Sequence, residues 1–254
     1  MRPKPLILAI ETSGRIGSAA IALGEQMLSE ARFSGPMRHS AEIFPAVHRL
    51  LERFSREPKE IEHIYISVGP GSFTGLRIAA ALAKTMHLAN AAKIIAVDTL
   101  DVIAANATDY IKEEKVKDLT QIATILDAKR GQFFIAAYQN KQGRWEKTMP
   151  DCLMTARQFL ENFAGSSQPA RLRLSATPRQ VWLLGEGLVY HKDKFKADGI
   201  RFLNERYWSP RAEKVHKLGW QKALAGQFAD PLTLQPTYLR KPDIKAGLPQ
   251  HLYT

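Results

Sequence analysis

The sequence predicts an α/β protein in which mixed sheets are flanked by helices. Strand and helix patterns alternate through the first hundred residues, and a second group of strands and helices follows after residue 120. A helix that follows a strand covers one face of the sheet, because both elements must bury an apolar side. With 254 residues, 45% of them hydrophobic, the chain can supply a buried core for one large domain or two smaller ones.

Three short strands open the chain, at residues 6–12, 18–23 and 27–33. Their residues are β-branched or alternate between apolar and polar, and glycine-containing turns separate them. Links this short favour an antiparallel meander.

Helices and strands then alternate. In residues 40–54 apolar side chains recur at three- and four-residue steps, which predicts a helix with one apolar stripe. We expect Ser40 to cap this helix and Pro45 to fall near its first turn. The elements that follow are a strand at 64–68, a helix at 76–91, a strand at 94–97 and a helix at 100–107 that Asp98 and Thr99 can cap.

The second half has weaker patterns. Residues 122–126 and 132–138 predict a β-hairpin, and residues 153–163 predict a helix. A short buried strand is expected at 181–184 and a last helix at 210–225. Between them, the polar and basic stretch 165–179 is expected to be a surface insertion.

Composition limits the class of protein. The net charge is +11, and the excess of Lys and Arg is larger after residue 150. This excess can attract a polyanion, or it can simply be a solvated surface. Cys152 is the only cysteine, which excludes an intrachain disulfide and a cysteine-rich zinc site. Because no apolar run of about 18 to 20 residues and no signal-peptide pattern occurs, we expect a cytoplasmic protein without a membrane segment.

The strongest local signal is the glycine-rich loop at 69–75, between a predicted strand and a predicted helix. Free N–H groups at the start of a helix favour anions, and glycine permits the turn that brings an anion close. The loop is not a P-loop, because Leu76 and Arg77 follow Gly75 in place of the Lys and Ser or Thr that hold phosphate and magnesium. A tight structural turn is the other interpretation.

A second polar group lies at the end of the first strand, where Glu11, Thr12 and Ser13 precede a turn. An acid with neighbouring hydroxyl groups suits a phosphate or a hydrated magnesium ion, although short polar residues also simply form turns. Together these two groups make up a candidate nucleotide or anion site of Glu11, Thr12, Ser13, Gly69, Gly71 and Ser72.

The sequence offers no clear catalytic or metal-binding group. No two histidines have the spacing of metal ligands on one helix face. His39 and Glu42 can form a polar pair at the start of the first helix, but a capping or surface role is the favoured interpretation. Ser72 has no neighbouring base and no nucleophile-elbow motif. We therefore predict no catalytic residue and no metal site.

Several segments, in order along nearly the whole chain, resemble the TsaB (YeaZ) family. The run at 69–78 is highly specific. The segments are LAIETS at 8–13, HS at 39–40, SVGPGSFTGLRI at 67–78, AVDTL at 96–100, LDAKRGQ at 126–132 and PTYLR at 236–240.

The resemblance implies a degenerate member of the actin-like ATPase superfamily with two ribonuclease-H-like lobes. The lobes are expected at 1–107 and 108–254, the second smaller and basic, with the helix at 210–225 able to pack back on the first. The implied function is that of a non-catalytic subunit in the transfer of threonylcarbamoyl from threonylcarbamoyl-AMP to the tRNA adenosine next to the anticodon.

The resemblance also implies partners. A TsaD-type subunit carries the chemistry and forms a heterodimer with the chain, and a TsaE-type ATPase completes a ternary complex. ATP and metal are therefore expected on the partner subunits and not on this chain. Contact with tRNA is expected through the complex.

Partner contact is implied for the helices at 40–54 and 74–90, and the same surface would serve a homodimer when TsaD is absent. Small residues bordered by large ones allow close packing, either inside the fold or between chains. Charge substitutions at Leu76, Ala80 or Ala83 are expected to block modification while the subunit stays folded. The residues expected at this partner-binding surface are His39, Glu42, Ile43, Val47, Phe73, Leu76, Arg77, Ala80, Ala83, Lys84 and His87.

Two other functions stay open. An ATPase or small-molecule kinase of the same superfamily would bind ATP and magnesium through Glu11 and Ser72. Many members of the family have Asp where this chain has Glu11, which weakens that alternative. A metalloprotease would need bound zinc or iron.

Overall fold

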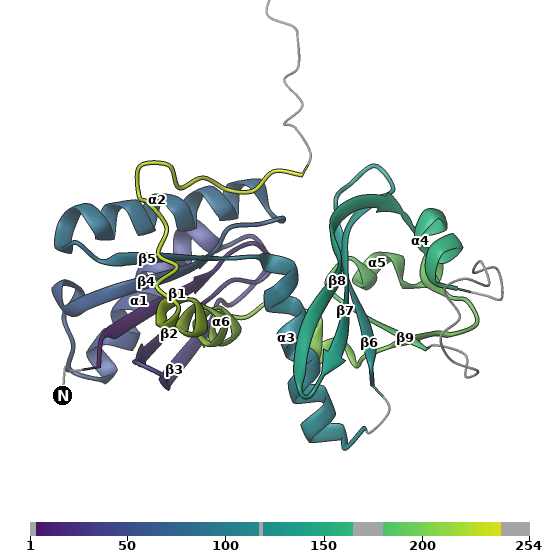
Figure 1. The fold of residues 1–254 in the computed structure, drawn as a ribbon. Coiled ribbons are helices and arrows are strands. Elements are labelled where there is room, and N and C mark those ends of the chain that lie inside the picture. Colours follow the sequence, from purple (N-terminus) through teal and green to yellow (C-terminus); the bar gives the residue numbers. More distant parts are fainter. Residues whose placement is uncertain (1–3, 117–118, 165–179, 240–254) are drawn as a thin grey trace, which may run out of the picture.

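A computed structural model describes residues 4–116, 119–164 and 180–239. These residues form two five-stranded sheets in two lobes, each with its own helices and hydrophobic core (Figure 1). The first sheet and its helices are β1 Leu6–Glu11, β2 Ser18–Leu23, β3 Gln26–Arg32, α1 His39–Arg53, β4 Ile61–Ser67, α2 Phe73–Asn90 and β5 Lys93–Val97. The remaining elements are α3 Thr99–Glu114, β6 Gln121–Asp127, β7 Gln132–Lys141, β8 Arg144–Thr155, α4 Ala156–Phe163, β9 Val181–Leu184, α5 Leu188–His191, β10 Ile200–Phe202 and α6 Ala212–Leu224.

The first sheet has the strand order β3-β2-β1-β4-β5. β1, β2 and β3 form the antiparallel meander expected from their short links, and β4 and β5 run parallel to β1. α1 and α2 pack on one face of this sheet, and α6 packs on the other. β1 is buried along its whole length because helices cover both faces.

The second sheet repeats this arrangement with the strand order β8-β7-β6-β9-β10. Its three long strands are antiparallel, and β9 and β10 run parallel to β6. The predicted hairpin at 122–138 is confirmed. The α/β class with two mixed sheets flanked by helices therefore holds for both halves of the chain.

Three local predictions are wrong. α1 begins at His39 without a side-chain cap, so Ser40 is not its N-cap, and Pro45 lies beyond the first turn. The predicted helix at 153–163 begins only at Ala156, after Thr155 has capped it through the Gln158 N–H. The preceding residues continue β8, an edge strand whose polar side chains hide the strand pattern.

The connections between the lobes are α3 and the segment that leads into α6 (Figure 1). α3 spans residue 107, and several of its apolar side chains join the core of the second sheet. α6 comes from the C-terminal part of the chain and lies on the first sheet. The expected insertion at 165–179 lies outside the described residues. No helix in the described part of the chain is long and apolar enough to cross a bilayer.

Candidate functional site

The carboxylate of Glu11 lies at the end of β1 and is fully buried. Its Oε1 accepts hydrogen bonds from the Ser13 backbone N–H (2.5 Å), the Ser13 hydroxyl and the Gly14 backbone N–H (3.3 Å). Oε2, like the Ser67 hydroxyl on β4, is buried without a hydrogen-bond partner of normal geometry. Burial raises the pKa of Glu11 above its ordinary value of 4.5, because the ionised form loses its hydration.

The loop at 69–75 packs directly on the turn that follows β1. The Ser72 N–H donates to the Ser13 carbonyl (2.8 Å), and the Thr12 hydroxyl donates to the Gly75 carbonyl (2.8 Å). A side chain at Gly75 would not fit, since its Cβ would lie 1.8 Å from the Thr12 carbonyl oxygen. The Gly75 N–H donates to the Ser72 hydroxyl (3.3 Å), which caps α2.

The six residues of the candidate nucleotide or anion site therefore lie in one place, at the ends of β1 and β4. The acid of this group is sealed from solvent, and the loop amides of Ser72 and Gly75 are hydrogen-bonded within the chain. In the described residues, no group of three or more His, Cys, Asp or Glu side chains is arranged to hold a metal ion.

His39 supports the same turn from α1. Its Nε2 lies 3.0 Å from the Gly14 carbonyl oxygen, so this nitrogen carries the hydrogen. Burial lowers the pKa of His39, which favours the neutral ring. Glu42 instead accepts from the Ser34 N–H (2.6 Å) and pairs with Arg38 (2.8 Å). His39 and Glu42 therefore do not form a polar pair, and His39 is buried and not on the surface.

Five of the residues expected on the partner-binding surface are buried inside the first lobe. The prediction of a surface role is wrong for these five, because the apolar stripes of α1 and α2 face the first sheet. A charge at Leu76, Ala80 or Ala83 would therefore enter the core of the lobe. The five residues are His39, Ile43, Leu76, Ala80 and Ala83.

Both helices also carry exposed apolar side chains. Phe44 on α1 is 65% exposed, and on α2 Phe73 is 39% and Leu88 is 84% exposed. Arg77 is exposed beside Phe73. We call Phe44, Phe73, Arg77 and Leu88 the outer helix face. Intermediate exposure is found for Glu42, Val47, Lys84 and His87.

Sequence reasoning missed Phe44 and Leu88. Phe44 belongs to the apolar pattern of residues 40–54 and adjoins Ile43, which is in the core. Consecutive residues of an α-helix lie about 100° apart around the axis, so an apolar stripe that includes two consecutive residues reaches the side of the helix that faces solvent. Leu88 lies five residues after the buried Ala83, and that spacing turns it out of the core.

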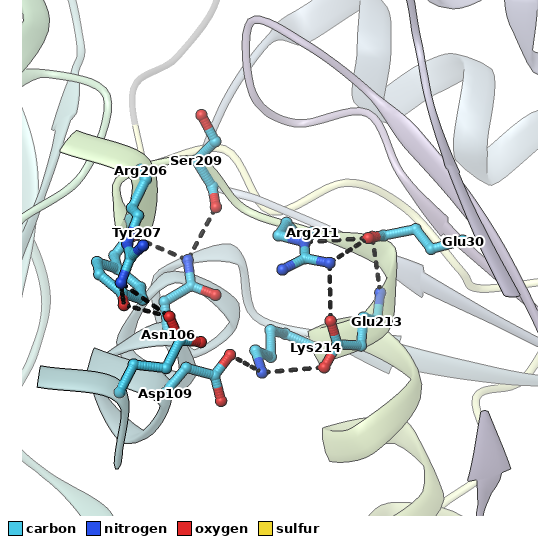
Figure 2. Close-up of polar contacts among 10 residues, drawn as sticks. Glu30, Asn106, Asp109, Arg206, Tyr207, Ser209, Arg211, Glu213 and Lys214 are labelled. Carbon is cyan, nitrogen blue, oxygen red and sulfur yellow. Dashed lines mark hydrogen bonds and ion pairs between the residues drawn. The ribbon is translucent and has the colours of Figure 1, made fainter. Parts of the chain in front are cut away.

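Charged side chains fix the start of α6 on the first sheet, as Figure 2 shows. Arg211, just before α6, donates through Nε to Glu30 on β3 (3.0 Å) and pairs with Glu213 (2.8 Å). The Glu213 N–H donates to the same Glu30 carboxylate (3.1 Å). Glu30 thus fixes the start of α6 against the edge strand of the first sheet.

The same segment is tied to α3 (Figure 2). The Asn106 amide donates to the backbone carbonyls of Tyr207 (3.0 Å) and Ser209 (2.8 Å). The Lys214 ammonium is buried and pairs with Asp109. These long-range contacts hold α6 and α3, and therefore the two lobes, in one relative position.

An acidic cluster lies where α3 meets β8. Asp98 caps α3 by accepting from the Leu100 N–H (2.8 Å). The Lys147 ammonium lies between Asp151 (2.5 Å), Asp101 (2.9 Å) and Asp98 (3.5 Å). Burial, a hydrogen bond with Asp151 and the charge of Asp101 raise the pKa of Asp98 to about 8.

Comparison with known proteins identifies the family. Residues 35–228 match the protein-family model described as "TsaD: tRNA N6-adenosine threonylcarbamoyltransferase". Over 94% of its length the chain is 31% identical to the tRNA threonylcarbamoyladenosine biosynthesis protein TsaB of Bacillus subtilis strain 168, covering 96% of that protein. The chain belongs to the TsaB family.

Other members support the assignment. TsaB of Escherichia coli strain K12 is 25% identical over 92% of this chain and 94% of its own length. The crystal structure "YeaZ from Pseudomonas aeruginosa" superimposes with a TM-score of 0.73 at 20% identity, covering 92% of this chain and all of that one. TsaB-family chains thus share this two-sheet fold.

Proposed function

We propose that this chain is a non-catalytic subunit in the formation of threonylcarbamoyladenosine on tRNA and that it acts by binding a TsaD-type transferase. The observation that carries this proposal is the outer helix face. Phe44, Phe73 and Leu88 expose apolar side chains on α1 and α2. Exposed apolar side chains bordered by polar ones are typical of protein-binding surfaces.

The geometry at Glu11 supports a non-catalytic role. An acid that activates water or holds a hydrated magnesium ion must reach solvent or substrate. The Glu11 carboxylate is sealed by the Ser13 turn, against which the loop at 69–75 packs. Opening this site would require several backbone contacts to break.

In the proposed complex, the TsaD-type subunit holds the metal and performs the transfer, and a TsaE-type ATPase joins the pair. This chain contributes the outer helix face and stabilises the active arrangement of its partner. The same face would pair two copies of the chain when the transferase is absent. Any contact with tRNA would be made within the complex.

Omission from a reconstituted reaction tests the proposal. The chain is mixed with its cognate TsaD and TsaE, threonylcarbamoyl-AMP and unmodified tRNA, and modified nucleoside is measured. We expect product only when the chain is present. Undiminished product in the absence of the chain would contradict its required role. Hydrolysis of ATP by the chain alone, lost on Glu11→Ala, would contradict its non-catalytic role.

A further inference from the structure

The described C-terminal segment returns from α6 and crosses α2 (Figure 1). Leu234 anchors it, because this side chain is buried in the core that α1 and α2 form with the first sheet. The Ala229 N–H donates to the Ile94 carbonyl on β5 (2.8 Å), which fixes the start of the segment. The segment is therefore an integral part of the first lobe.

Its next attachment lies at the glycine-rich loop. The Thr237 N–H donates to the Val68 carbonyl at the end of β4 (2.7 Å). Gly69 has a φ of +117°, and a Cβ there would lie 2.7 Å from the Thr237 carbonyl oxygen. Glycine at 69 thus serves two needs, since it allows the backbone conformation and leaves room for the segment.

The segment then reaches the outer helix face. The rings of Tyr238 and Phe73 lie 5.1 Å apart between centroids, and the Arg77 guanidinium lies 3.7 Å from the Phe73 ring centre. Arg77 Nε also donates to the Tyr238 hydroxyl (3.3 Å). Tyr238 is 38% exposed and Phe73 39%, so the three side chains form a cluster that is fixed on one side and open on the other.

We propose that the segment 234–239 is a permanent part of the TsaD-binding surface, with Tyr238 holding Phe73 and Arg77 in the arrangement that the partner contacts. This inference rests on the proposed function. Tyrosine and arginine are enriched among residues that dominate binding energy, and side chains held in place before binding lose less entropy.

The opposite arrangement would make the segment a cover that the partner must displace. The two arrangements predict opposite effects on TsaD binding when the contacts of Tyr238 are removed. Removing part of a binding surface weakens the complex, whereas removing a cover strengthens it, because the partner no longer has to break the covering contacts.

Binding of wild-type and variant chains to purified TsaD, measured by calorimetry, tests the inference. Tyr238→Ala removes the ring and the hydroxyl, and we expect the dissociation constant to rise about 10- to 100-fold. Tyr238→Phe keeps the ring on Phe73, and we expect a rise of only about threefold. Tyr190→Ala is the matched control, because Tyr190 is an exposed tyrosine on the second lobe. Thermal melting of the free chains checks that each variant is folded.

The outcomes separate the two proposals. If the wild-type chain does not bind TsaD, the proposed function fails, and this inference fails with it. If wild-type binds and Tyr238→Ala binds equally well or more tightly, only the role of the segment is overturned. If Tyr190→Ala weakens binding as much as Tyr238→Ala, the specific role of Tyr238 is likewise overturned.

Discussion

The ammonium of Lys214 pairs with the carboxylate of Asp109, and only 1% of the lysine is exposed. Lys214 lies on α6, which packs on the first sheet, and Asp109 lies on α3, which packs on the second. Glu213 provides a second carboxylate at 3.2 Å. A buried charge needs partners of this kind, so the pair links the two lobes through a contact that is costly to break.

Lys214→Met is expected to lower the free energy of unfolding by about 3 kcal/mol, because it leaves the partly buried Asp109 without its main partner. Urea unfolding followed by circular dichroism measures the change. Lys217→Met is the control, since Lys217 is exposed on the same helix, and it should change stability by less than about 0.5 kcal/mol. Equal stability of the two variants would show that the Lys214–Asp109 pair contributes little to the free energy of unfolding.

Local patterns predicted much of the first lobe from sequence. Its three opening strands follow from alternation and short turns, and α2 follows from the strand, glycine loop and small-residue helix in succession. Contacts such as that between Arg211 and Glu30 could not be predicted, because the two residues are 181 positions apart. β8 was missed because an edge strand needs no strong apolar alternation.

The candidate sites show the same limit. The structure brings Glu11, Ser13 and Ser72 together because β1 and β4 run parallel, so that their ends meet at one edge of the sheet. The sequence could not tell which side of α1 and α2 faces the core, because an apolar stripe serves a sheet or a partner equally well. Ile43 and Ala83 face the sheet, as burial shows.

Ala83→Asp is expected to destabilise the first lobe by roughly 3 kcal/mol or more, because it places an unpaired charge in the core. Ala81→Asp makes the same change two residues earlier, on the exposed side of α2, and should leave the chain folded. Melting temperatures of the two variants test this contrast. A melting temperature of Ala83→Asp equal to that of wild-type would contradict the buried position of Ala83 in the core.

Leu88→Lys is expected to leave the chain folded and to weaken TsaD binding about tenfold, since it removes exposed apolar area from the outer helix face. A cation near the C-terminus of α2 is compatible with the helix dipole. Leu224→Lys changes a similarly exposed leucine at the end of α6 and serves as the control. A loss of binding caused equally by both variants would contradict a specific role of Leu88.

Glu11→Gln is expected to keep or increase stability at pH 8, because Gln fills the same space without a buried charge. The raised pKa of Glu11 means that its stabilising effect is full below pH 4.5 and is lost as the pH rises. The advantage of Gln over Glu should therefore shrink from pH 8 to pH 5. Glu11→Ala should cost about 1 to 3 kcal/mol, because the Ser13 donors lose their acceptor.

The modification assay adds a second readout for Glu11. If the site is vestigial, Glu11→Gln supports the same yield of modified tRNA as wild-type when TsaD and TsaE are present. An inactive but stably folded Glu11→Gln chain would assign chemistry to this acid and would contradict the proposal of a non-catalytic subunit.

Asp98→Asn is expected to make stability less dependent on pH. The pKa of Asp98 is about 8 in the folded chain, against an ordinary 3.8, so folding favours its protonated form. The contribution of Asp98 to the free energy of unfolding is therefore largest below pH 3.8, and it is lost as the pH rises towards 8. The loss is at most about 1.4 kcal/mol per pH unit for one proton. Asn also caps helices, so the Leu100 N–H keeps an acceptor.

Urea unfolding at pH 5, 6, 7 and 8 measures this effect as the difference between wild-type and Asp98→Asn. We expect the variant to become steadily more stable relative to wild-type across this range, since only wild-type takes up a proton in the cluster around Lys147 when it folds. Asp230→Asn makes the same substitution at an exposed position, where the side chain accepts from the Leu232 N–H, and is measured alongside as the control for removal of a carboxylate. A difference between Asp98→Asn and wild-type that does not change with pH would mean that Asp98 is ionised throughout, with Lys147 compensating for its burial.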